Sequence, residues 1–142
     1  MKNKYFIYTD GGAKGNPGPA GIGFIILDEK GFKVTQQGKF IGEATNNRAA
    51  YQAVIEGLST IGQILKNTND FEVHCLLDSQ LVVEQLNQRY KIKDENLKQL
   101  FWQIRDLILS LGGRVIFEHI SREQNKQADK LVNLAVQKRG DV

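Results

Sequence analysis

The 142-residue sequence is poor in cysteine and in long apolar runs. Its single cysteine, Cys75, can form neither a disulfide framework nor a cysteine-based metal knuckle, so we expect a reducing setting and a cytoplasmic protein. Only four apolar residues, at positions 5–8, follow the lysines near the start of the chain. This run is too short for a signal peptide or a membrane span, and we expect no membrane association.

Strong charge and histidine pairs are also missing. The net charge is +3 and the pI is about 9.0, which mildly favours a polyanionic partner. The two histidines, His74 and His119, lie within predicted strands at no ligand spacing, which argues against a zinc site. No repeat, low-complexity tract or linker divides the chain. We expect one domain over residues 1–142, a frayed tail over 138–142 and a monomer.

The order of the predicted elements is typical of an α/β protein. Apolar alternation and turn residues predict three strands, at 4–10, 20–27 and 33–41, the last two joined by a tight turn. A helix beginning near Thr45, with an apolar stripe from Tyr51 to Leu65, then leads to a fourth strand at 71–77. Helices at 79–88 and 94–111, a fifth strand at 114–120 and a helix capped at Ser121 or Asn125 follow. The helical crossover before the fourth strand predicts that it runs parallel to the first.

Three carboxylates come from separate predicted elements. Asp10 follows the first strand, Asp78 follows the fourth, and Asp129 lies in the early turns of the last helix. Asp10 taken alone is better explained by a turn-forming Asp-Gly pair, and Asp129 taken alone is explained by the helix dipole. If the first and fourth strands are parallel neighbours, Asp10 and Asp78 emerge side by side at the carboxyl edge of the sheet, where ligands bind in α/β folds.

Acids that cluster without a basic partner repel each other, which raises their pKa values unless divalent cations lie between them. Oxygen-only ligands suit magnesium or manganese. Two such ions can activate a water and stabilise the leaving oxygen during phosphodiester hydrolysis. The glycine-rich stretch after Asp10 is no phosphate loop, because it lacks the Gly-Lys-Ser/Thr ending and leads into a strand. Its Asn16 serves either as a contact to a phosphate backbone or simply as a turn residue.

Four motifs in order resemble the signatures of type 1 ribonuclease H. They are Thr9-Asp10-Gly11-Gly12 with the glycine-rich loop at 15–19, Thr45-Asn46-Asn47-Arg48-Ala49, Asp78-Ser79-Gln80, and Asn125-x-x-Ala128-Asp129-x-Leu131. The resemblance implies a ribonuclease H-like α/β fold, in which a five-stranded mixed sheet, three strands antiparallel and then two parallel, is flanked by helices. It also implies an endonuclease that cuts the RNA strand of RNA/DNA hybrids with two Mg²⁺ ions, or Mn²⁺ as a substitute.

The same resemblance assigns roles to individual residues. Asp10, Asp78 and Asp129 would be catalytic metal ligands. Five residues would contact the hybrid: Asn16, Thr45, Asn46, Asn47 and Gln80. Discrimination for RNA would rest on the 2′-hydroxyl, which DNA lacks.

Two departures from the family pattern stand out. The family's fourth carboxylate, a glutamate, is replaced by Ala50, and neither Glu43 nor Glu56 is placed to substitute for it. We expect a chain with little or no cleavage activity that still binds hybrids; the alternative is a naturally non-catalytic hybrid-binding module. The second departure is the short stretch at 87–96, which has no room for the basic insertion of some relatives and resembles the compact form of the family. Arg122 or His119 would take the role of the family's mobile residue near the last acid.

Overall fold

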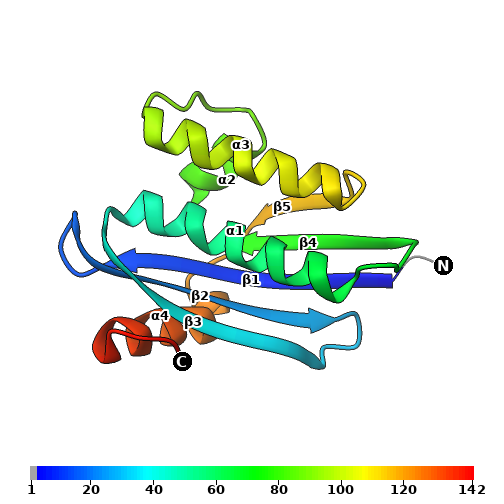
Figure 1. The fold of residues 1–142 in the computed structure, drawn as a ribbon, viewed down its shortest axis with the longest axis horizontal. Helices are drawn as coiled ribbons and strands as arrows, with labels where there is room; N and C mark the ends of the chain where they lie inside the picture. The colour runs from blue at the N-terminus through cyan, green and yellow to red at the C-terminus, as the bar shows by residue number, and fades with distance from the viewer. Residues whose placement is uncertain (1–2) are drawn as a thin grey trace.

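A computed structural model describes residues 3–142, which are built on one five-stranded sheet (Figure 1). The strands lie in the order β3-β2-β1-β4-β5. Strands β1 (Asn3–Ala13), β2 (Gly18–Asp28) and β3 (Lys33–Ala44) are antiparallel, while β4 (Phe71–Leu77) and β5 (Val115–His119) continue the sheet in parallel with β1. The predicted fold, a five-stranded mixed sheet with three antiparallel strands and then two parallel ones, flanked by helices, is confirmed.

Helices cover both faces of the sheet. One face carries α1 (Asn46–Ile64), α2 (Gln80–Leu86) and α3 (Glu95–Ser110), and the other carries α4 (Lys126–Lys138), which lies against β1, β2 and β3 (Figure 1). The apolar stripe of α1 faces the sheet, since Tyr51, Val54, Leu58 and Ile61 are fully buried. The core therefore lies mainly between the sheet and α1 and α3. Among the described residues, no helix is both long enough and apolar enough to span a membrane.

Side-chain caps set where the helices begin. The Thr45 hydroxyl accepts a hydrogen bond from the Arg48 amide (3.1 Å), which starts α1. Ser121 and Gln124 form the predicted capping box, because the Ser121 amide donates to Gln124 Oε1 (3.0 Å) and the Gln124 amide to Ser121 Oγ (3.3 Å). This box opens a short 3₁₀ turn (Glu123–Asn125) ahead of α4. Asn125, the alternative cap, does occupy the N-cap position of α4, but its side chain makes no capping hydrogen bond.

Strand β1 runs three residues past its predicted end at Asp10. Its pairing with β4 stops at Tyr8 opposite Leu76, whereas its pairing with β2 continues to Ala13 opposite Ala20. Continued hydrogen bonding on one side keeps Gly11 and Gly12 extended, although the Asp-Gly sequence predicted a turn. Asp10 consequently lies on a strand that is still paired with β2, two residues past the last residue of β1 that pairs with β4.

The end of the chain is held against β3. The backbone N–H of Val142 donates to the carbonyl of Gly38 (2.9 Å), and the N–H of Gly38 donates to the carbonyl of Val142 (3.0 Å). An edge strand leaves such groups unpaired, so it offers partners to a passing segment. The structure differs here from the frayed tail predicted over 138–142, because α4 continues to Lys138 and Val142 returns to the sheet.

Two close backbone approaches fix how the helices sit on the sheet. A Cβ atom at Gly11 of β1 would overlap the carbonyl oxygen of Ala49 in α1. A Cβ atom at Gly23 of β2 would lie 2.6 Å from the carbonyl oxygen of Ala128 in α4. Glycine is required at both positions, because any side chain would push the helix away from the strand.

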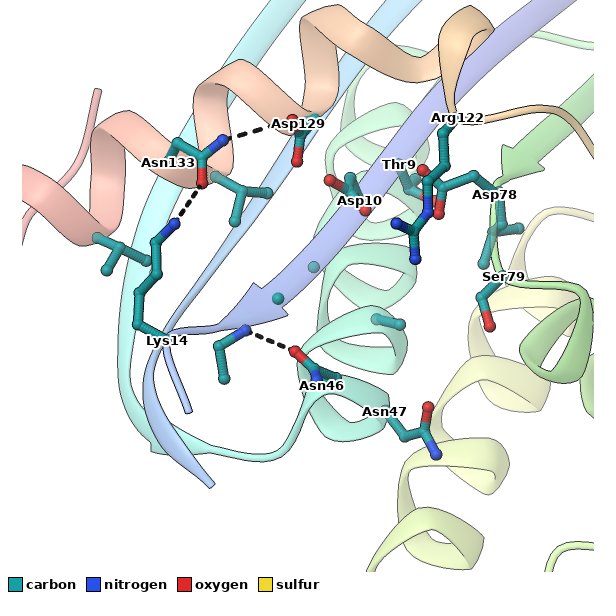
Figure 2. A pocket seen from close by; sticks show the side chains of 17 residues that line it. Thr9, Asp10, Lys14, Asn46, Asn47, Asp78, Ser79, Arg122, Asp129 and Asn133 are labelled. Carbon is teal, nitrogen blue, oxygen red and sulfur yellow. Dashed lines mark hydrogen bonds between the residues drawn. The ribbon is translucent and has the colours of Figure 1, made fainter. Parts of the chain in front are cut away.

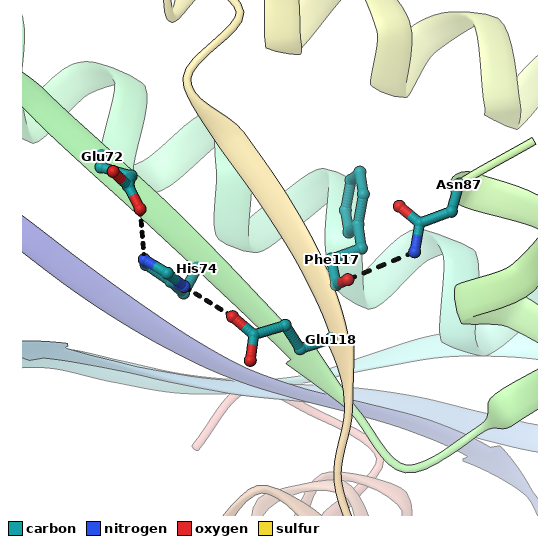
Figure 3. A network of polar contacts seen from close by, with 5 residues as sticks. All are labelled: Glu72, His74, Asn87, Phe117 and Glu118. Carbon is teal, nitrogen blue, oxygen red and sulfur yellow. Dashed lines mark hydrogen bonds and ion pairs between the residues drawn. The ribbon is translucent and has the colours of Figure 1, made fainter.

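A charged network joins β4 to β5. His74 Nδ1 lies 2.6 Å from Glu118 Oε1, and His74 Nε2 lies 2.7 Å from Glu72 Oε1 (Figure 3). The imidazole also stacks on Phe6, with ring centroids 5.0 Å apart. His74 therefore acts as a cross-strand link between β4 and β5.

Candidate active site

Three acidic side chains meet at a cavity of about 480 Å³ beyond the end of β4 (Figure 2). Asp10 comes from β1, Asp78 directly follows β4, and Asp129 comes from α4. All three line the cavity, so the structure brings together the acids that the sequence predicted to converge.

The glycine contacts explain this convergence. Asp10 of β1 is paired with Gly23 of β2, and the main chain of Ala128 in α4 packs directly against Gly23. The close approach therefore places Asp129, the next residue of α4, near Asp10. On the other face of the sheet, α1 approaches Gly11 closely. A Cβ atom added at Gly11 would lie 2.6 Å from the amide nitrogen of Ala50. Position 50 is consequently beside Asp10 as well.

The cavity brings the carboxyl groups of Asp10, Asp78 and Asp129 close together, and Lys14 and Arg122 also line it. Burial, the charges of Asp78 and Asp129 and a hydrogen bond to Asp129 together raise the pKa of Asp10 to about 8, with burial the largest cause, against the lowering effect of the Gly11 N–H. At neutral pH, Asp10 therefore carries a proton unless a cation takes its place.

The donor chemistry of the cavity fits a hard divalent cation, since it offers carboxylate oxygens and neither histidine nor cysteine. The arrangement is open: within residues 3–142, no three His, Cys, Asp or Glu side chains already surround a position for an ion. A carboxylate with a raised pKa and two acidic neighbours is nonetheless the environment that a divalent ion relieves.

Position 50 contributes no oxygen to this cavity. Ala50 is half-buried and lines the cavity wall. Glu56 is bound elsewhere, since its Oε1 lies 2.5 Å from Lys39 Nζ on β3. Glu43 is exposed on β3 and does not line the cavity. Neither glutamate adds a carboxylate to the cavity.

The predicted substrate-contacting residues divide into two groups. Asn46 and Asn47 line the cavity, whereas Asn16, Thr45 and Gln80 do not. Asn16 Oδ1 accepts a hydrogen bond from the Asn46 amide (3.0 Å), and Asn46 Oδ1 accepts one from the Ala13 amide (2.8 Å). These bonds tie the glycine-rich loop to the start of α1, so two of the asparagines organise the rim of the cavity.

The two candidates for the mobile residue are also separated. Arg122 lines the cavity and is exposed, and Figure 2 shows its guanidinium near Asp78. His119 is exposed at the end of β5 and does not line the cavity. The geometry favours Arg122.

Sequence reasoning missed the residues that hold the acids. Asn125, only 1% exposed, donates from Nδ2 to the Thr9 carbonyl (2.8 Å) and to Asp78 Oδ2 (3.2 Å). Asn133 Nδ2 donates to Asp129 Oδ2 (3.4 Å), and Lys14 Nζ donates to Asn133 Oδ1 (3.3 Å). The spacing of four residues between Asp129 and Asn133 on one helix was a usable signal for the second contact. Asn125 stands in one of the four motifs, but its contact with Asp78 was not indicated, since that contact joins segments 47 residues apart.

Comparison with known proteins gives a consistent family. A family model described as reverse transcriptase-like matches residues 8–135. A ribonuclease H of Pseudomonas entomophila is 32% identical over 155 residues, which cover 96% of this chain and 95% of that protein. A bifunctional protein of Mycobacterium tuberculosis is 39% identical over 134 residues, covering 94% of this chain and 35% of that protein. The chain thus spans about a third of the length of its mycobacterial relatives.

A solved structure is also similar over nearly the whole chain. LC11-RNase H1, which was isolated from compost by a metagenomic approach, has been solved in complex with an RNA/DNA hybrid. That complex is 44% identical, with a TM-score of 0.92, and the match covers 95% of this chain and 98% of that one.

Proposed function

Since the chain belongs to the type 1 ribonuclease H family, we propose that its acidic cavity is the site at which the RNA strand of an RNA/DNA hybrid is bound and hydrolysed. The observation that carries this proposal is the meeting of Asp10, Asp78 and Asp129, from three separate elements, at one open cavity. The similar structure of LC11-RNase H1 contains an RNA/DNA hybrid, and this supports the same class of substrate.

We propose that the three aspartates hold two Mg²⁺ ions, for which Mn²⁺ would substitute. When bound, such ions supply an activated water and stabilise the leaving oxygen. The chain itself contributes the three carboxylates, and it holds Asp10 in place within the paired strand β1. The Asp10 proton is released when a cation binds, because the raised pKa reflects burial and neighbouring negative charge.

Recognition of the hybrid belongs to the rim of the cavity. We propose that Asn46 and Asn47, at the start of α1, contact the hybrid, with Asn16, Thr45 and Gln80 alongside them. Helices α2 and α3 are joined by residues 87–94 alone, which supports the compact form of the family. Affinity would then depend on few phosphate contacts. A monomer acting in the cytoplasm is part of the same proposal.

Ala50 sets the activity of this chain. The methyl group offers no ligand beside Asp10, and neither nearby glutamate lines the cavity. We propose that cleavage is abolished or strongly impaired while hybrid binding persists. The alternative, a naturally non-catalytic hybrid-binding module, rests on the same residue.

The decisive experiment compares the chain with Ala50→Glu and Ala50→Gln on a labelled RNA/DNA hybrid in Mg²⁺. A strong gain of RNA cleavage in the glutamate variant alone supports an impaired nuclease, because glutamine has the size of the missing side chain without its charge. Hybrid binding with no gain in any variant favours the binding module. Robust cleavage by the unaltered chain overturns the role given to position 50.

A further inference from the structure

Asn133 and Lys14 form a chain of hydrogen bonds that ends on Asp129 (Figure 2). We propose that Asn133 is a positioning residue for the Asp129 carboxylate, and that Lys14 holds the Asn133 amide in the orientation this requires. The inference rests on the proposed metal-binding role of Asp129. It adds two residues that lie outside the motifs of the sequence.

The contacts place Asn133 between a cation and an anion. Asn133 lies four residues after Asp129 on α4, and its Nδ2 is 3.4 Å from Asp129 Oδ2. Lys14 reaches it from the loop between β1 and β2, with Nζ 3.3 Å from Asn133 Oδ1. The chain of bonds thus spans the cavity rim from the glycine-rich loop to the helix that carries the acid.

The charges of the two neighbours determine which way the amide points. The lysine ammonium only donates, so it must face the amide oxygen. An ionised carboxylate only accepts, so it must face the amide nitrogen. Only one of the two amide orientations satisfies both neighbours, and in it the N–H group is directed at Asp129.

Asp129 needs such support more than the other two acids do. Asp10 is carried by a paired strand, and Asp78 receives a hydrogen bond from the buried Asn125. Asp129 is exposed on the surface of α4, where hydrogen bonds from Asn133 and to the Asp10 carboxyl are what restrain its rotation. An oriented outer partner is what commonly fixes a carboxylate ligand before the metal arrives.

The test measures Mg²⁺ affinity by NMR titration of the intact chain, without substrate. Asn133→Leu removes the donor at similar size and is expected to weaken Mg²⁺ binding roughly three- to tenfold. Asn133→Gln retains an amide at the same helix spacing and is expected to stay within about twofold of the unaltered chain. The matched control is Gln137→Leu, an exposed change one helical turn further along α4, which leaves the affinity unchanged. Equal affinity in Asn133→Leu and Gln137→Leu, with both folded, overturns the proposal.

A double-mutant cycle isolates the contribution of Lys14. Lys14→Met removes both the hydrogen bond and a positive charge that repels the ions. Losing the repulsion between Lys14 and the ions changes Mg²⁺ affinity equally in the unaltered chain and in Asn133→Leu. Any difference in the effect of Lys14→Met between these two backgrounds therefore comes from its hydrogen bond to the Asn133 amide. We expect Lys14→Met to reduce affinity by about twofold more when Asn133 is present. Identical effects in the two backgrounds overturn the role of Lys14.

Cleavage gives a second readout that separates this inference from the proposed function. In the Ala50→Glu background, Asn133→Leu is expected to lower kcat while leaving KM for the hybrid unchanged. If Ala50→Glu cleaves no hybrid, the proposed function fails, and the Mg²⁺ titration still decides the role of Asn133. If Ala50→Glu cleaves and the titration shows no effect of Asn133→Leu, only the positioning role fails.

Discussion

The buried amide of Asn125 donates a hydrogen bond to the carboxylate of Asp78 across 3.2 Å. The same nitrogen donates to the main-chain oxygen of Thr9, the residue before Asp10 (2.8 Å). One side chain therefore connects the strand that carries the first acid to the second acid itself, and it comes from the segment that leads into α4. The three elements of the site meet at Asn125.

Replacing Asn125 with alanine is expected to destabilise the fold by about 1–3 kcal/mol, because the buried Thr9 carbonyl loses its partner. Mg²⁺ affinity should also fall, since Asp78 is no longer held. Urea denaturation and Mg²⁺ titration measure the two effects. The control is Asn87→Ala, which removes a single donor to the Phe117 carbonyl (3.3 Å) in the network of Figure 3. It should cost stability alone, and an unchanged Mg²⁺ affinity in Asn125→Ala would contradict the link.

The raised pKa of Asp10 predicts a stability that falls as pH rises. Its pKa is 3.8 as a free side chain and about 8 in the fold, so between these values the folded chain binds more protons than the unfolded chain. Stability is then lost progressively from about pH 4 to pH 8, with no further loss above that range. Asp10→Asn, which cannot ionise, should have a Tm advantage over the unaltered chain that grows across this window. Thermal melts at about pH 5, 7 and 9, which lie in the lower part of the window, in its upper part and above it, measure this advantage.

Added Mg²⁺ provides the counter-test for the same group. Bound cations compensate the charge of Asp10, so saturating Mg²⁺ should reduce the advantage of Asp10→Asn at high pH. An advantage that is equal at all three pH values would show that Asp10 ionises normally.

Gly11 is expected to tolerate no side chain, whereas its neighbour should. A Cβ at Gly11 would overlap the Ala49 carbonyl, so Gly11→Ala should destabilise the fold by about 1–3 kcal/mol or more and displace position 50 from Asp10. A Cβ at Gly12 would meet nothing closer than Asn46 Oδ1 at 3.8 Å, and Gly12→Ala should be close to neutral. Chemical denaturation of the two variants measures the contrast, and equal stabilities would refute the backbone contact.

Arg122 is expected to contact a phosphate of the bound hybrid. It is exposed at the cavity beside Asp78, where the acids alone would repel a polyanion. Arg122→Ala should weaken hybrid binding and lower the slope of log affinity against log salt by about 1. Lys30→Ala is the control, because Lys30 is exposed in the β2–β3 turn at the opposite end of the sheet (Figure 1). Fluorescence anisotropy at several salt concentrations measures both, and equal slopes would remove Arg122 from the interface.

Much of the fold followed from local signals in the sequence. Apolar spacing predicted α1 and α3, and the Ser121–Gln124 capping box was predicted residue by residue. The parallel placement of β4 beside β1 followed from the handedness of the crossover. These features depend on residues close in sequence or on a general rule of chain geometry, which is why one sequence was sufficient.

The features that the sequence did not predict depend on distant partners. Strand β1 passes Asp10 because β2 continues to pair with it, and Val142 is ordered because Gly38 lies at an open edge. The supports of the acids, Asn125 and Asn133, were not assigned for a similar reason. Asparagine is a common helix cap, so the sequence suggested that role for Asn125. Its actual partners, Thr9 and Asp78, are distant in the sequence and become neighbours only in the folded chain.

The contacts of Gly11 with Ala49 and of Gly23 with Ala128 are made by main-chain atoms. At these two points the distances of α1 and α4 from the sheet are therefore set by main-chain atoms, which every aliphatic side chain has in common. Leucine, isoleucine and valine can be exchanged through the core while Asp10, position 50 and Asp129 keep their mutual placement. A library that randomises the interior and spares these two glycines should yield variants that differ widely in stability yet share one geometry of the acids.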